Sequence, residues 1–464
     1  MSKRKMNAGR KSAPRPIGSR EFAYQLLSEF EQSGEFLSSS IDSRERELAE
    51  RDRPFVRNLM QTVVRRKLTL EAVLRQFVER DVEPGLWLLL KLGASQLLFG
   101  SQKHRHADLN ETVEIARSIG QPRWCGFLNG VLRSISRELT DETGTAALDG
   151  SWYPSEAAEL FRKLNRPVFP DPQSEFQQYL SVAYSLPAWL IERWSRRWNR
   201  EELHEIAVWF LHPQPLCLRV NKLLASRDEI LATFASQKIR CFAGTIADSL
   251  VGLPSGASVL NLPGWNDGHF SVQDETAQHA ALTLDPQPGE TVLDLCAAPG
   301  TKTTHLAEMM QNRGTIIATD VSDDRLEKVR DNARRLKLEI IQIVPIDRDG
   351  NGIPDGPFDA ILIDAPCTNT GVLGKRIEAR WRITSRDIEE LSTLQQRLLQ
   401  QAADRVRPGG RILYSTCSIE PEENEHNVQN FLSSRPEFEL RSENFFRPGD
   451  PSDGGYQALL VRKV

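Results

Sequence analysis

The feature that most constrains the fold is an alternation of apolar strand patterns with helical patterns from residue 290 to near the C-terminus. The strand patterns are "TVLDLC" (291–296), "GTIIATD" (314–320), "IIQIVPID" (340–347), "FDAILIDAP" (358–366) and "GGRILYSTC" (409–417). Helical patterns separate them, notably over 323–338 and 387–407. Near-continuous apolar strands that alternate with helices are typical of a parallel sheet covered on both faces. We therefore predict an α/β domain over residues 284–464.

Acidic and thiol side chains follow the predicted strands one after another. They are Cys296, Asp320, Asp347, Asp364, Cys367 and Cys417. In open α/β sheets, ligands bind beyond the carboxyl ends of the strands. A single acid after a strand commonly caps the next helix. Acids and cysteines after successive strands instead favour a ligand-binding or catalytic edge.

The stretch "DLCAAPGTKTTHLAE" (294–308) joins the first strand to a helix through a turn that contains Gly300. Glycine permits close approach of the backbone to a ligand, and a helix start offers free N–H groups. The stretch matches neither GxGxxG nor GxxxxGK[ST], which disfavours a nucleoside triphosphate. Asp320 ends the next strand, about where an acid binds ribose hydroxyls in dinucleotide folds. An adenosine-containing cofactor without a pyrophosphate, S-adenosylmethionine, fits this pattern; an ordinary strand–helix crossover is the alternative.

Two cysteines, Cys367 and Cys417, lie at the ends of the fourth and fifth predicted strands. They are 50 residues apart, which suits one helical crossover between adjacent strands. A cysteine after a strand is usually an inert, small apolar residue. Two at one sheet edge, beside a cofactor loop, favour nucleophilic or redox chemistry. A nucleophilic thiol needs a nearby cation or helix start, and we predict a helix near Pro421, just after Cys417.

Upstream of the α/β domain the sequence divides into further parts. Residues 21–140 repeat apolar side chains at helical spacing, without a strand pattern, and predict an all-helical domain. Residues 141–183 contain many Pro, Gly and Ser residues and predict a linker or a decorated connection. Residues 184–283 mix helical and strand patterns and predict a small α+β domain. The basic segment 1–20 predicts a disordered tail, with a phosphate-contacting arm as the alternative.

Composition and charge exclude some classes of protein. No apolar run reaches the roughly 18 residues of a membrane-spanning helix, and the N-terminus lacks the apolar stretch of a signal peptide. The six cysteines show no metal-ligand spacing and predict reduced thiols, with no metal site. We expect a cytoplasmic protein that binds no membrane.

The net charge of −4 does not indicate nucleic-acid binding. Arginine and tryptophan residues are interleaved over 193–200 and 375–382, however. This pattern indicates either packing with a solvated rim or a base-stacking and phosphate-binding surface.

At three motifs the sequence resembles a known family. "DLCAAPGTKT", "DAPCTNTGVL" and "YSTCSIEPEENE" are similar to the motifs of the Sun-type (Fmu/Sun) RNA cytosine-5 methyltransferases. "LNETVEIAR" (109–117) and "FLNGVLR" (127–133) resemble the NusB-like domain at the front of the family's small-subunit ribosomal RNA enzymes. The resemblance implies a Rossmann-like S-adenosylmethionine-dependent methyltransferase domain. It also implies an all-α NusB-like domain and a small α+β RNA-binding domain ahead of it.

The resemblance also implies roles for individual residues. Cys417 would be the nucleophile that attacks C6 of cytosine, and Cys367 would help to release the product. Asp364 would lie near the reacting centre, Asp320 would hold the ribose and Asp347 would lie beside the adenine. The cofactor loop would comprise Cys296, Ala297, Ala298, Pro299, Gly300, Thr301 and Lys302.

The implied partner is RNA, with small-subunit ribosomal RNA favoured and transfer RNA as the alternative. We expect a monomer. A ribosome-assembly or RNA-binding factor that has lost activity is a second hypothesis, although both cysteines of the active enzymes are present. DNA methylation is disfavoured, because in those enzymes we expect the cysteine of the Pro-Cys pair to be the nucleophile.

Overall fold

The computed structural model describes residues 17–33, 37, 41, 44–157, 159–246, 248–253, 259–449 and 452–464. Most of the predicted basic tail, residues 1–16, lies outside the described residues. The chain divides into two compact units. The first comprises the residues up to 142 together with 163–168, and the second comprises 143–162 together with 169–464.

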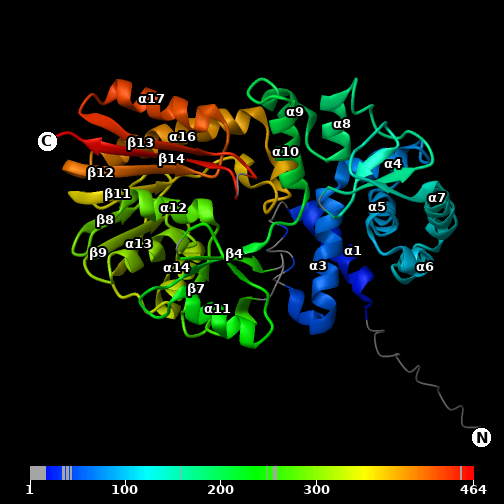
Figure 1. The fold of residues 1–464 in the computed structure, drawn as a ribbon, viewed down its shortest axis with the longest axis horizontal. Coiled ribbons are helices and arrows are strands. Elements are labelled where there is room, and N and C mark those ends of the chain that lie inside the picture. Colours follow the sequence, from blue (N-terminus) through cyan, green and yellow to red (C-terminus); the bar gives the residue numbers. More distant parts are fainter. Residues whose placement is uncertain are drawn as a thin grey trace, which may run out of the picture. The chain divides into compact units, whose positions relative to one another are not determined.

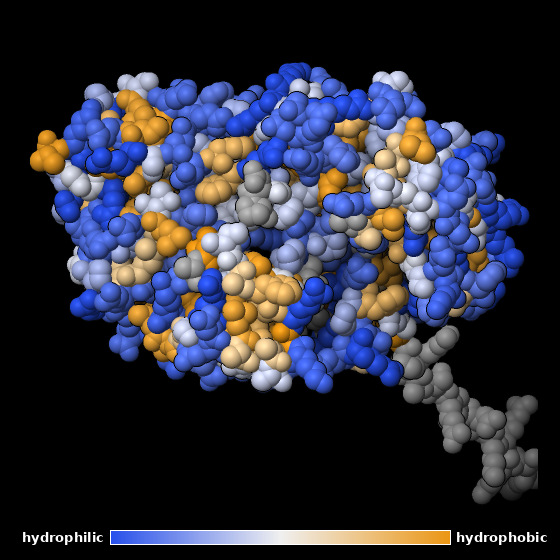
Figure 2. All heavy atoms as spheres, viewed as in Figure 1, coloured by the Kyte–Doolittle hydropathy of each residue, from blue (hydrophilic) through white to orange (hydrophobic). Residues whose placement is uncertain are grey.

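The first unit is helical, as predicted (Figure 1). Its helices are α1 (Ser19–Ser33), α3 (Arg53–Arg65), α4 (Lys67–Arg75), α5 (Pro84–Phe99), α6 (Arg105–Ser118) and α7 (Cys125–Glu138). Proline stands in the first turn of α3 and of α5, where its missing N–H costs nothing. Helix α5 is buried along almost its whole length, whereas hydrophilic side chains cover the face of α6 and α7 seen in Figure 2. Among the described residues, no helix has the length and apolarity needed to span a membrane.

The predicted linker or decorated connection, residues 141–183, contains folded elements. Strands β1 (Leu139–Gly144), β2 (Trp152–Pro154) and β3 (Phe161–Leu164) pair in the order β1-β3-β2, and α8 (Phe176–Ala183) follows. Trp152, Tyr153 and Phe161 are buried. These aromatic side chains provide a small core. The sequence interpretation missed it because it relied on the Pro and Gly content of the segment.

Within its described residues, the predicted α+β region contains four helices and an antiparallel sheet. The helices are α9 (Ala188–Trp194), α10 (Arg200–Leu211), α11 (Arg227–Ser236) and α12 (Glu275–Leu284). The strands pair in the order β5-β6-β4-β7, and they are β4 (Leu216–Val220), β5 (Phe242–Ala243), β6 (Ser249–Leu253) and β7 (Phe270–Val272). These helices and strands agree with the mixture of helical and strand patterns over residues 184–283.

The C-terminal domain contains a seven-stranded sheet in the order β10-β9-β8-β11-β12-β14-β13. Its strands are β8 (Thr291–Asp294), β9 (Thr315–Asp320), β10 (Ile341–Pro345), β11 (Phe358–Asp364), β12 (Val406–Thr416), β13 (Phe438–Phe446) and β14 (Gly455–Arg462). The five predicted strands are confirmed and are parallel to one another. The complete sheet is mixed, because the additional strand β14 is antiparallel to both β12 and β13. No helix separates β13 from β14, so this hairpin lacked the strand–helix rhythm that revealed the others.

Helices cover both faces of this sheet (Figure 1). One face packs against α16 (Ser385–Ala403) and α17 (Glu425–Ser434). The other packs against α12 and α13 (Thr301–Met309), with α14 (Asp323–Arg335) against the loop after β8. Strand β8 lies between β9 and β11, so the chain reverses its direction across the sheet there. Ligands of open α/β sheets bind at such a switch point.

Candidate active site

The two cysteines at the strand ends lie together. Cys417 directly follows β12, and Cys367 lies three residues beyond the end of β11, its parallel neighbour. Their Sγ atoms are 3.1 Å apart, and both residues are half-buried. The Cys417 sulfur is also 3.3 Å from Oδ1 of Asn369. The structure therefore brings together the two thiols that the sequence assigned to one edge.

Their environments distinguish the two thiols. The hydrogen bond to the Cys417 sulfur raises the pKa of Cys367 well above its usual range, and burial raises it further. Cys367 is therefore the thiol that keeps its proton and can donate it towards Cys417. Because only a thiolate is a strong nucleophile, the raised pKa of Cys367 disfavours this thiol for attack on a substrate.

Lys302 links the loop after β8 to the end of β11. Its ammonium nitrogen is 2.5 Å from Oδ1 of Asp364. Burial lowers the pKa of Lys302, but the Asp364 carboxylate and the charge of a Cys417 thiolate raise it, and the net direction is upward. The lysine is thus a cation, and it lies within electrostatic reach of both Asp364 and the Cys417 sulfur.

The predicted cofactor loop forms a tight turn before α13. Gly300 has φ +96°, and a Cβ there would lie 3.1 Å from Cα of Val329. Its N–H donates to the carbonyl of Ala297 at 2.7 Å. Only glycine combines this backbone conformation with such close packing. Ala297 and Ala298 are buried, Pro299 is exposed and Thr301 is the first residue of α13.

Asp320 lies against this loop, as the adenosine prediction requires. The residue is 4% exposed, and its carboxylate accepts the N–H groups of Ala298 and Ser322 at 3.2 and 3.1 Å. A carboxylate at a strand end beside a glycine turn and a helix start has the chemistry to hold ribose hydroxyls. These residues therefore fit an adenosine-containing cofactor.

The positions of Cys296 and Asp347 support their predicted cofactor-binding roles less directly. Burial, followed by the charges of nearby acids including Asp294, raises the pKa of Cys296 well above its usual range, so this thiol stays protonated. Asp347 is exposed beyond the end of β10, and its carboxylate accepts a hydrogen bond from the Asn351 side chain at 2.7 Å. That bond, together with backbone N–H donors, lowers the pKa of Asp347. Asp347 thus lies at the predicted edge of the sheet but is already hydrogen-bonded within its own turn.

The structure adds residues that the sequence prediction missed. Asn369 contacts the Cys417 sulfur, and Glu423 is a fully buried acid beside both cysteine segments. Asp294 ends β8 and is fully buried, with Oδ2 bonded to the Thr303 hydroxyl and Oδ1 without a partner. Burial raises the pKa of Asp294 to about 7. Of these three residues, only Glu423 had a signal in the sequence, because it lies in the glutamate-rich stretch after Cys417.

Helix α9 braces the segment that follows Cys417. The indole N–H of Trp194 donates to Glu420 at 2.9 Å, and Arg193 pairs with both Glu420 and Glu422. Arg197 donates to the carbonyl of Ile419 at 2.7 Å. These side chains of the 193–200 cluster therefore agree with the packing interpretation, because they hold the segment that follows Cys417.

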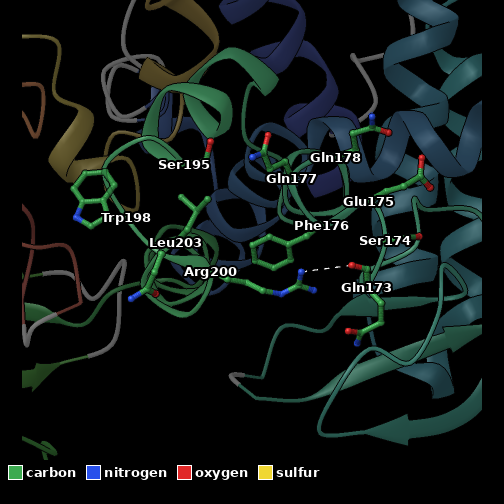
Figure 3. A pocket seen from close by; sticks show the side chains of 11 residues that line it. Gln173, Ser174, Glu175, Phe176, Gln177, Gln178, Ser195, Trp198, Arg200 and Leu203 are labelled. Carbon is green, nitrogen blue, oxygen red and sulfur yellow. Dashed lines mark hydrogen bonds between the residues drawn. The ribbon is translucent and has the colours of Figure 1, made fainter.

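A separate cavity of about 540 Å³ lies beside α8 and α10 (Figure 3). Phe176, Trp198, Arg200 and Leu203 are among its lining residues. Arg200 lies over the Phe176 ring and donates to the carbonyl of Pro172 at 2.5 Å. None of the predicted site residues lines this cavity.

Comparisons with known proteins match the helical unit, most of the α+β region and the C-terminal domain. Residues 281–459 match the 16S rRNA methyltransferase RsmB/F family, 18–137 match the NusB family, and 186–259 match the ferredoxin-like domain of RsmF/B-like methyltransferases. The chain is 33% identical over 445 residues to a probable ribosomal RNA small subunit methyltransferase B of Synechocystis sp., covering 92% of each chain. It is 30% identical over 426 residues to the Bacillus subtilis protein described in the same words, covering 90% and 89%. A solved methyltransferase homolog protein from Pyrococcus horikoshii is 28% identical with a TM-score of 0.55, covering 62% of this chain and 99% of that one.

Proposed function

The chain belongs to the family of ribosomal RNA small subunit methyltransferase B proteins, and from this premise we propose that it methylates C5 of a cytosine in small-subunit ribosomal RNA. Membership confirms the predicted resemblance, the RNA methyltransferase activity and S-adenosylmethionine as the cofactor. The NusB and ferredoxin-like matches confirm the predicted class of the two preceding parts. The observation that carries the cytosine assignment is the 3.1 Å approach of the Cys367 and Cys417 sulfurs.

A cytosine C5 carbon is too weak a nucleophile to accept a methyl group directly, and a thiolate can correct this. Attack of the Cys417 thiolate at C6 makes C5 enamine-like and reactive. After the transfer a base removes the C5 proton, and the Cys417 thiolate is eliminated. The close approach of Cys367 to that sulfur and its raised pKa support a role as the proton donor that assists the elimination.

Asp364 and Lys302 support this chemistry from the adjacent strand ends. Asp364 is only partly exposed and pairs with Lys302, so its carboxyl group is held in one orientation. A carboxyl group held in this way can accept a hydrogen bond from the N4 amino group of the base and, when protonated, can donate one to N3 as the adduct forms. The Lys302 cation attracts the Cys417 thiolate before it attacks.

The residues that would hold the cofactor are the 296–302 loop and Asp320. S-adenosylmethionine supplies the methyl group when it is bound there. The helix start after Gly300 offers N–H groups, and the buried Asp320 carboxylate offers acceptors for ribose hydroxyls. We expect Asp347, two residues beyond Pro345, to lie beside the adenine.

Small-subunit ribosomal RNA is the favoured substrate because the relatives that align with about nine-tenths of this chain are described as probable ribosomal RNA small subunit methyltransferases. The target cytosine has to leave any base stack to reach a thiolate, which favours a loop or an unfolded segment. Such a substrate would place the protein in the cytoplasm. Transfer RNA is the alternative substrate within the same chemistry.

The decisive experiment is transfer of labelled methyl from S-adenosylmethionine to protein-free small-subunit ribosomal RNA, bulk transfer RNA and duplex DNA in parallel. We expect label as 5-methylcytosine in ribosomal RNA with the wild-type chain and none with Cys417→Ala. The variant should still bind S-adenosylmethionine in calorimetry. Label in transfer RNA alone would change the substrate, and retained turnover in Cys417→Ala would reject the nucleophile assignment.

A further inference from the structure

Glu423 places one buried carboxylate between the segments that follow the two cysteines. The residue is 0% exposed. Its Oε1 accepts the backbone N–H of Thr368 at 2.9 Å and the side-chain amide of Gln395 at 3.1 Å. Its Oε2 accepts the hydroxyl of Ser418 at 2.5 Å and also contacts the Thr368 hydroxyl.

The bonded residues are the direct chain neighbours of the two thiols. Thr368 follows Cys367, and Ser418 follows Cys417. The two cysteine segments touch elsewhere through the Thr370 and Ser418 hydroxyls, 3.1 Å apart. The Glu423 contacts differ from that one because a single rigid carboxylate accepts hydrogen bonds from both segments, from Thr368 and from Ser418.

We propose that Glu423 is a positioning residue that fixes the separation of the Cys367 and Cys417 sulfurs. The catalytic meaning of that separation rests on the proposed function, whereas the separation itself does not. Because proton donation between the thiols requires close approach, a small shift of either segment impairs the elimination step.

The donors around Glu423 explain why an acid is needed there. A carboxylate accepts at both oxygens, and the surrounding N–H and O–H groups converge on it. Replacement by glutamine puts an NH₂ group in place of one of the two acceptor oxygens, so the groups that donate to that oxygen lose their acceptor, which costs free energy in a buried site. The Glu423 charge also raises the pKa of Cys367, after the hydrogen bond to Cys417 and burial, and so helps to keep that thiol protonated.

The test measures the distance between the sulfurs without using activity. Dibromobimane becomes fluorescent when it bridges two neighbouring thiols, and peptide mapping identifies the bridged pair. The full-length chain should form a Cys367–Cys417 bridge, and Cys367→Ala should not. We expect Glu423→Gln to bridge about tenfold more slowly. Glu389→Gln, which changes an exposed acid on α16, should bridge at the wild-type rate.

A second variant keeps the proposal testable if Glu423→Gln does not fold. Thr368→Val and Ser418→Ala each remove one hydroxyl and leave Glu423 in place, so each should slow bridging about threefold. Wild-type bridging rates in Glu423→Gln, or in the Thr368→Val and Ser418→Ala double variant, would overturn the positioning role.

Methyl transfer is measured on the same samples to separate the two proposals. In Glu423→Gln we expect the turnover rate to fall about tenfold or more while the KM for RNA changes little. A wild-type chain that bridges, responds to Glu423→Gln and transfers no methyl to any RNA would overturn the proposed function and support the Glu423 assignment.

Discussion

Lys302 and Asp364 form an ion pair, with Nζ 2.5 Å from Oδ1, that joins the cofactor loop to the end of β11. The lysine side chain is 12% exposed, and the aspartate side chain is 34% exposed. The charge of a Cys417 thiolate also stabilises the ammonium form of Lys302. One cation therefore connects the proposed cofactor loop, Asp364 and the proposed nucleophile Cys417.

Lys302→Met should reduce the rate of methyl transfer about 100-fold or more, because it removes a cation that pre-orients a carboxylate and attracts a thiolate. Single-turnover kinetics with ribosomal RNA would measure the effect. Lys328→Met changes an exposed lysine on α14 and serves as the control. A Lys302→Met rate within threefold of wild type would contradict the role given to this cation.

Asp320→Ala should weaken S-adenosylmethionine binding about 10- to 100-fold, the usual cost of losing hydrogen bonds to a charged group. Calorimetric titration of the chain without RNA measures this affinity directly. Asp331→Ala removes an exposed acid on α14 and should leave the affinity unchanged. An unchanged dissociation constant in Asp320→Ala would reject its role as the ribose ligand.

The sequence revealed the strands and their ends because apolar periodicity is a local property. The sequence alone therefore assigns Cys367 and Cys417 to one edge of the sheet. Glu423 could not be assigned a role, because its importance depends on Thr368 and Gln395 reaching it from other segments. Arg219 was hidden for the same reason: an arginine in a strand pattern shows no sign of a buried partner 89 residues away.

Arg219 lies on β4 with no exposed surface and pairs with Glu308 of α13 at 2.7 Å. Arg219→Met should lower the free energy of unfolding by about 3–5 kcal/mol, because it leaves an uncompensated buried acid. Urea denaturation would measure the loss. Lys222→Met breaks the more exposed pair with Asp248 and should cost at most about 1 kcal/mol. Equal losses in the two variants would show that burial of the Arg219 pair has no special effect.

The buried Asp294 predicts a specific pH dependence of stability. Its folded-state pKa of about 7 lies above the ordinary value of 3.8, mainly because of burial. Its contribution to stability is therefore complete below about pH 4 and is lost as the pH rises towards and through 7. Asp294→Asn has no charge to bury, so its stability relative to wild type should increase over this range by about 2–4 kcal/mol. Urea denaturation at pH 5 and pH 8 measures the difference, and a constant difference would contradict the raised pKa.

Cys367→Ala should trap the enzyme on its RNA. The variant keeps the Cys417 sulfur but loses the protonated thiol 3.1 Å away, so attack on C6 proceeds while elimination is slowed. With S-adenosylmethionine and ribosomal RNA, we expect about tenfold or more of a denaturation-resistant protein–RNA complex compared with wild type.

Two controls decide how that complex is interpreted. Cys125→Ala changes a half-buried thiol in the helical unit and should resemble wild type. The double variant Cys367→Ala with Cys417→Ala should form no complex, because the attacking sulfur is absent. A complex that survives in the double variant would show that another group attacks the RNA. Absence of a complex in Cys367→Ala under conditions where wild type turns over would reject product release as the function of Cys367.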